Sequence, residues 1–173
     1  MNIQLKYFTL GAIIIFCQIL LSEYVNIWHI LYIAIFPLYI ILLPANLNRS
    51  AYMLIAFMLG LCVDITADGV LGLNAAALVA MAYFREFVLK LTLTKGNLES
   101  AENLPISTRT VEVPKLITIN LIMLAIFFTV YVLLDSAASF SPIYTILKIT
   151  LCTAVNCIIN LLCNIVLLEK ILR

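Results

Sequence analysis

The stretch that decides the fold lies at residues 60–77 and reads GLCVDITADGVLGLNAAA. It joins two apolar runs and places acidic residues, glycines and an amide where one helix ends and the next begins. A helix from Arg49 to Asp64 is ~22 Å long, which is less than the ~30 Å thickness of a bilayer's hydrocarbon core. We therefore expect Asp64 below the membrane surface, facing the bundle interior, a partner helix or a water-filled recess.

The other polar residues of this stretch suggest how the hairpin is fixed. Asp68 or Thr66 is expected to cap the free amides of the following helix, and the glycines permit a tight turn and close helix approach. Asp64 and Asp68 could instead be ordinary turn residues at the surface. The candidate residues for structure and partner docking here are Gly60, Asp64, Asp68, Gly69, Gly72 and Asn74.

The composition places the chain in a membrane. Of its 173 residues 65% are apolar and only 11% are charged, and the mean hydropathy is +1.16. Soluble domains carry roughly 45–50% apolar and about 25% charged residues, so a water-soluble protein is excluded. The net charge of +1 indicates neither a nucleic-acid partner nor a polybasic membrane tether.

Apolar runs bounded by charged or turn residues predict a single all-α membrane domain over residues 1–173 with six transmembrane helices. The first run is interpreted as a retained helix, because no small-residue cleavage site follows it. Residues 90–115 form a polar loop. The predicted helices cover residues 7–22, 27–43, 51–66, 70–89, 116–134 and 143–168.

The basic residues indicate the orientation. With the N-terminus inside, nine of them fall on the cytoplasmic side, which predicts an N-in, C-in topology and a cytoplasmic loop 90–115. Lys148 alone is left near the outer end. His29 falls among aromatic residues at the outer interface, where no second ligand is spaced to complete a metal site. The nine residues are Lys6, Arg49, Arg85, Lys90, Lys95, Arg109, Lys115, Lys170 and Arg173.

The last helix carries a row of amides. Asn156, Asn160 and Asn164 follow Cys152 at four-residue spacing, so all lie on one slowly drifting face. Asparagines in lipid need partners, and the favoured interpretation is hydrogen bonding between helices. The alternative is the lining of a substrate pathway. Asn120 in the fifth helix is a further candidate donor.

Catalytic patterns are absent from the sequence. It contains no Ser-His-Asp set, no HExxH and no phosphate-binding glycine loop. The spacing Gly60-x-x-x-Asp64-x-x-x-Asp68 resembles the second half of the CDP-alcohol phosphotransferase motif, but the first half is missing. We therefore expect a protein that is not an enzyme and that has no cofactor and no bound metal.

The hairpin resembles that of the rod shape-determining protein MreD family. In that family a Gly-x-x-x-Asp near the end of the third helix is followed by a Leu-Gly-x-x-Ala turn into the fourth. Here the matching residues are Gly60, Asp64, Leu71, Gly72 and Ala75. The chain length and the six predicted spans agree with that family over the whole chain. The loop 90–115 is longer than the corresponding loop expected for the family.

The resemblance implies a non-catalytic scaffold subunit of the cell-elongation machinery in the bacterial inner membrane. Its direct partner would be the single-pass protein MreC, through which MreB filaments are linked to RodA and a penicillin-binding transpeptidase.

Two other functions remain open. The family resembles in fold the substrate-binding subunits of energy-coupling-factor vitamin transporters, so such a subunit is the main alternative. However, residues 11–16 lack the small residues at four-residue spacing that support docking in those transporters. A third class, an ion channel, would require a charged ring or filter-like loop.

Overall fold

The structure is a computed structural model, and it describes residues 3–24, 31–45, 47–68, 70–94, 96–98, 105–106, 110–136 and 141–171. Side chains are described within these ranges except at 3–6, 23–24, 68 and 166–171. The described part is all-helical and contains no β-strand. The predicted all-α class is therefore confirmed for these residues.

Six α-helices and one π-helical turn organise the described chain. They are α1 (Ile3–Tyr24), α2 (Pro37–Leu42), α3 (Arg49–Val63), the π-helical turn η1 (Asp64–Asp68), α4 (Leu73–Thr92), α6 (Val113–Asp135) and α7 (Pro142–Ile171).

Three helical stretches in the described part are long and apolar enough to cross a membrane. They are Arg49–Ala67, which joins α3 to η1, Val113–Asp135 and Pro142–Ile165. Helix α1 contributes a shorter apolar stretch, Tyr7–Ser22. These helices indicate a membrane protein.

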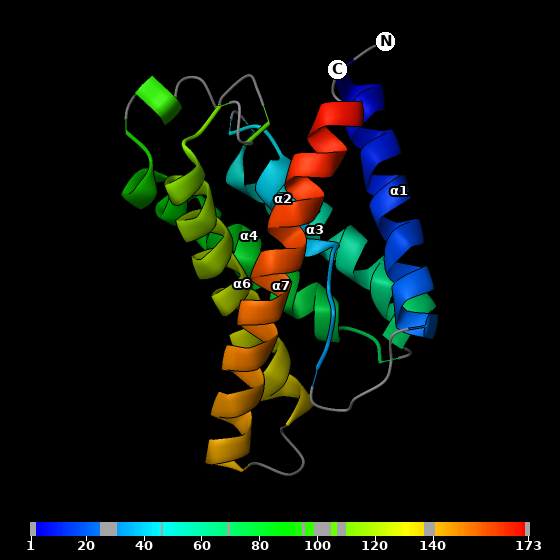
Figure 1. Ribbon diagram of the computed structural model, residues 1–173. Helices are drawn as coiled ribbons and strands as arrows, with labels where there is room; N and C mark the ends of the chain where they lie inside the picture. The colour runs from blue at the N-terminus through cyan, green and yellow to red at the C-terminus, as the bar shows by residue number, and fades with distance from the viewer. Residues whose placement is uncertain are drawn as a thin grey trace.

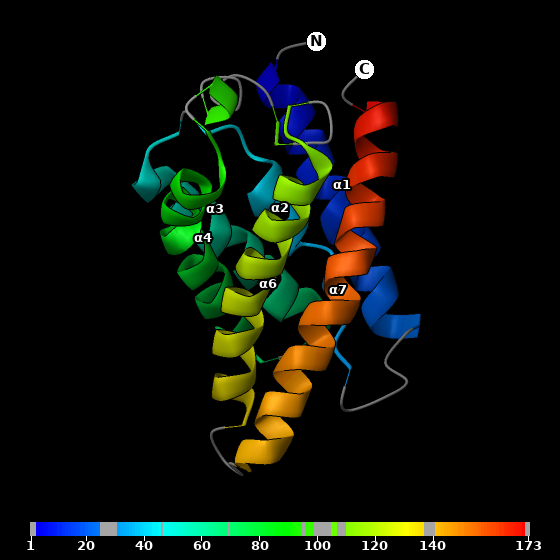
Figure 2. The ribbon, with the colours of Figure 1, turned by 60° about the vertical axis from the view of Figure 1, so that its left-hand side comes forward.

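The helices pack in sequence order around a central short helix (Figures 1 and 2). Helix α3 packs on α4, α4 on α6 and α6 on α7, while α2 contacts α1, α4 and α6. The beginning of α1 and the end of α7 lie at the same end of the molecule, where α4 also ends and α6 begins.

The second predicted helix, 27–43, is wrong over much of its length. Residues 31–35 are not helical, and α2 covers only Pro37–Leu42; residues 25–30 lie outside the described part. Pro37 explains where the helix begins, because proline lacks an N–H, is suited to the first helical turn and disfavours helical geometry in the preceding residue. Figure 1 shows the preceding segment running between α1 and α7.

This broken element still reaches across the bundle. An extended chain advances ~3.3 Å per residue, so the non-helical residues 31–35 would cover ~17 Å. The six residues of α2 add ~9 Å.

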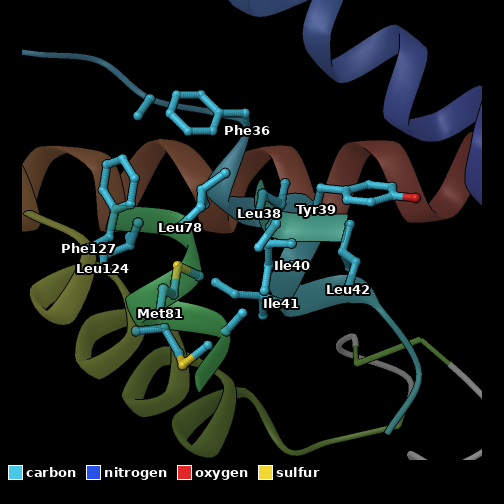
Figure 3. Packing of buried hydrophobic residues seen from close by; sticks show 14 of the residues in the cluster. Phe36, Leu38, Tyr39, Ile40, Ile41, Leu42, Leu78, Met81, Leu124 and Phe127 are labelled. Atoms are coloured by element: carbon cyan, nitrogen blue, oxygen red, sulfur yellow. The ribbon is translucent and has the colours of Figure 1, made fainter. Parts of the chain in front are cut away.

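All six residues of α2 are buried, and they form the centre of the hydrophobic core. Figure 3 shows Leu38 and Ile41 among side chains of α4 and α6. The ring of Phe36, which precedes α2, meets Phe127 of α6 edge to face, with 5.5 Å between ring centroids. Such burial repays the loss of chain entropy that a short irregular segment requires.

Gly60 sets the closest approach between α3 and α4. A Cβ at this position would lie 2.7 Å from the backbone nitrogen of Ala75 and closer still to its Cα. Real Cβ atoms do not approach backbone this closely, and a backbone atom cannot move aside as a flexible side chain can. Gly60 is therefore required for this helix crossing.

We predict that Gly60→Ala destabilises the full chain by about 1–3 kcal/mol, the usual cost of forcing a group into a packed contact. Thermal unfolding in detergent, followed by circular dichroism, measures the effect. Gly96→Ala is the matched control, because a Cβ at Gly96 would meet no atom of the described part within 4 Å apart from its chain neighbours. Equal unfolding temperatures for the two variants would contradict the close crossing.

Candidate functional site

The irregular segment before α2 is held on one side by α7. Asn156 binds it twice: its Oδ1 accepts from the N–H of Ala34 at 2.7 Å, and its Nδ2 donates to the carbonyl of Tyr32 at 2.7 Å. One turn later, Asn160 Nδ2 donates to the carbonyl of Ala34 at 3.2 Å. The N–H of Tyr32 points to Cys152 Sγ at 3.5 Å.

Helix α1 holds the opposite side through one amide. Gln18 Nε2 donates to the carbonyl of Ile33 at 3.0 Å, and Gln18 Oε1 accepts from the N–H of Ile35 at 2.9 Å. Residues 32 and 34 thus bond toward α7, and residues 33 and 35 toward α1. This alternation is the pattern of an extended strand whose two neighbours have been replaced by side-chain amides.

These bonds correct the interpretation of the amide row. Asn156 and Asn160 do not join one helix to another, because their partners outside α7 are backbone groups of residues 32 and 34. Backbone N–H and C=O groups buried in an apolar bundle must be satisfied by protein, and here polar side chains replace the bonds that a regular helix would have made internally.

Asn164, the third amide in the row, is completely buried, but neither of its amide atoms has a hydrogen-bond partner in the described part. Asn120 donates to the carbonyl of Leu116 within its own helix, and its Oδ1 is unpaired there. The structure therefore gives neither residue a role in joining two elements.

Asp64 caps α4. Its side chain is completely buried and accepts from three N–H groups: Gly72 at 2.8 Å, Asn74 at 2.9 Å and Ala75 at 3.2 Å. The first N–H groups of a helix have no partner within the helix, and the helix dipole favours a negative charge beside them. Asp64 therefore faces the bundle interior and binds the chain's own backbone.

The capping expected of Thr66 is wrong, since its hydroxyl donates to the carbonyl of Cys62 in the preceding turn at 2.7 Å. The Asp68 side chain and Gly69 lie outside the described part. Gly72 precedes α4 with φ of 94°, a left-handed conformation that glycine adopts without steric cost. The turn thus delivers three amides to a single carboxylate.

Asn74 connects this hairpin to the irregular segment. The hydroxyl of Tyr32 donates to Asn74 Oδ1 at 3.4 Å, and the Tyr32 ring stacks on Tyr131 of α6 with 4.6 Å between centroids. Tyr32 thus lies where α4, α6 and α7 converge. The two polar groups centred on Asp64 and on Asn156 are therefore linked.

Lys148, the one basic residue expected near the outer side of the membrane, pairs with Asp135. Its Nζ lies 2.7 Å from Asp135 Oδ2, and the pair joins the end of α6 to α7. Among the residues with described side chains, no three His, Cys, Asp or Glu gather as metal ligands.

Two structural roles were not predicted from the sequence. One is that of Gln18, a long amide within the apolar run 7–22. The other is that of Arg85, which was expected as a cytoplasmic charge, but only 2% of Arg85 is exposed, and its Nη2 donates to the carbonyls of Ile41 and Leu43 at the end of α2. Proline within the run 27–43 was the available signal for a broken helix.

We predict that Asp64→Ala destabilises the chain by about 2–4 kcal/mol, because three backbone amides, those of Asn74 and Ala75 buried, lose their acceptor. Asp64→Asn keeps one acceptor oxygen and should recover about half of the loss. Chemical unfolding in detergent gives the values. Glu112→Gln, which changes an exposed carboxylate at the beginning of α6, should shift the stability by under about 0.5 kcal/mol. A similar result for Asp64→Ala would show that the cap is dispensable.

We also predict that Asn156→Leu costs about 2–4 kcal/mol, since it leaves the Ala34 N–H and the Tyr32 carbonyl without these partners. Asn120→Leu is the matched control, a buried asparagine that bonds to no other element, and it should cost less than about 1 kcal/mol. Hydrogen exchange of the Ala34 amide reports the local effect. Unchanged protection of that amide in Asn156→Leu would disprove the role of Asn156.

No family model matches this chain, and comparisons with curated proteins and with solved structures also find no match. The family resemblance thus stands on the hairpin residues Gly60, Asp64, Leu71, Gly72 and Ala75 and on the expected topology.

Proposed function

We propose that this chain is a non-catalytic, multi-pass scaffold of the bacterial inner membrane that binds transmembrane helices of partner proteins. Within the cell-elongation complex, or elongasome, its direct partner is MreC. The chain thereby helps to couple MreB filaments to peptidoglycan synthesis by RodA and a penicillin-binding transpeptidase.

The observation that carries this proposal is the use of the buried polar side chains. Gln18, Asp64, Asn156 and Asn160 all bind the chain's own backbone. The atoms bound in this way fix a shape and are not available to bind a substrate or relay protons. In the described part, Asn160 Oδ1 and both amide atoms of Asn164 have no partner. A fixed shape is what a scaffold must present to its partners.

The outer surface supports helix docking. Between α1 and α3 lies an apolar groove of about 450 Å³, which includes Gly11, Ala12 and Met58. A second groove of about 430 Å³ lies over α4 and α6 and includes Phe84 and Ala125. Helices associate in lipid through close van der Waals packing, for which small residues and shaped grooves are suited.

The proposal is tested by recovering the tagged chain from native membranes and identifying its partners. Filling either groove, by Ala12→Leu or Ala125→Leu, should leave the chain folded, and one of the two should reduce MreC recovery at least about fivefold. Ala154→Leu is the control, because Ala154 is exposed on α7 and lines neither groove. Asp64→Ala and Asn160→Leu should impair cell shape by loosening the scaffold.

Three results would contradict the scaffold. Normal shape, expression and MreC recovery in both Asp64→Ala and Asn160→Leu would remove its structural basis. A vitamin-like molecule found by mass spectrometry in the purified chain would instead identify a transporter subunit. Conductance of liposomes containing the chain would identify a channel.

A further inference from the structure

A cavity of about 310 Å³ opens beside the beginning of α3 and the end of α4, and we name it the basic pocket. Its polar lining comes from both helices. The lining includes Asn48, Arg49, Tyr52, Arg85, Glu86 and Lys90.

Arg85 lies at the wall of the basic pocket as a buried cation without a carboxylate. Its guanidinium lies 4.5 Å from the ring centroid of Tyr52 and donates to the carbonyls of Ile41 and Leu43, while its Nε has no partner in the described part. No acidic side chain with a described position lies within ion-pair distance of it. Carbonyls and an aromatic ring orient a guanidinium but do not neutralise it, so burial favours a counter-anion.

The neighbouring charges leave the pocket positive. Lys90 pairs with Glu86 at 2.6 Å, so these two charges cancel. Arg49 is exposed, lies 3.7 Å above the ring of Tyr83 and donates to the carbonyl of that residue at 2.9 Å. Two arginines that form no ion pair in the described part therefore line one cavity, beside the positive end of the α3 dipole.

We propose that the basic pocket binds a phosphate group. Guanidinium groups match phosphate oxygens in geometry and charge better than a single ammonium does. The remaining lining, Ala45, Leu47, Leu89 and Leu98, is apolar and suits the first carbons attached to a phosphodiester. The phosphate is supplied by an anionic lipid headgroup or by a free phosphate compound.

Native mass spectrometry of the full chain in neutral detergent tests the proposal, with phosphatidylglycerol, phosphatidylcholine and inorganic phosphate as the probes. One phosphatidylglycerol should be retained about tenfold more tightly than phosphatidylcholine, whose headgroup has no net charge. Arg49→Gln should remove most of this preference. Lys115→Gln should leave it unchanged, because Lys115 is paired with Glu112 and does not line the pocket.

Comparing phosphatidylglycerol with inorganic phosphate distinguishes the two sources of the phosphate group. Retention of phosphatidylglycerol that millimolar inorganic phosphate does not displace assigns the pocket to lipid, whereas stoichiometric binding of inorganic phosphate that excludes the lipid assigns it to a free compound. Arg85→Gln should abolish binding of either phosphate source. Because Arg85 is buried, that variant could lose binding by misfolding, so the exposed Arg49→Gln provides the independent test. The proposal is overturned if neither anion binds, or if the preference survives in Arg49→Gln at the wild-type level.

Discussion

Every buried backbone N–H and C=O in an apolar bundle needs a hydrogen-bond partner, and residues 32–35 find most of theirs without forming a helix. Five of these backbone groups bond to the side-chain amides of Gln18, Asn156 and Asn160. The arrangement permits a non-helical segment to lie inside an apolar bundle. It also ties α1 to α7 through the segment between them. The central position of α2 depends on these bonds, because six residues are too few to form a stable helix alone.

Asp64 and Arg85, two of the charged groups buried near helix ends, follow a common rule. Asp64 accepts from the N–H groups that open α4, and Arg85 donates to the carbonyls that close α2. Each charge therefore meets the helix end of opposite polarity, where the partial charges of unpaired backbone groups accumulate. The middle of the bundle uses neutral amides instead. This division is physically reasonable, since an uncharged amide loses far less hydration on burial than a carboxylate or guanidinium does.

The sequence predicted the long apolar helices well, because their patterns are local. Five of the predicted ranges overlap α1, α3, α4, α6 and α7. The break before α2 was missed because hydropathy alone does not distinguish an apolar strand from an apolar helix. Its partners also lie far away in the sequence: Asn156 is separated from Ala34 by 122 positions. Asp64 was recognisable as a costly buried group, but the cap of the following helix was expected from Asp68 or Thr66, and the Thr66 hydroxyl bonds to the carbonyl of Cys62 instead.

The hydrogen bonds within the bundle constrain how a partner could be recognised. Since Asp64, Gln18 and Asn156 bind backbone, a helix docking from outside would meet the apolar side chains of the two grooves. Specificity in the proposed scaffold then comes from shape, with small residues setting how closely the helices approach. Shape is useful for recognition only if it is fixed, because a groove that relaxes around any helix discriminates poorly. The internal amides and the Asp64 cap thus contribute to binding indirectly, because they fix the relative positions of the helices whose surfaces form the grooves.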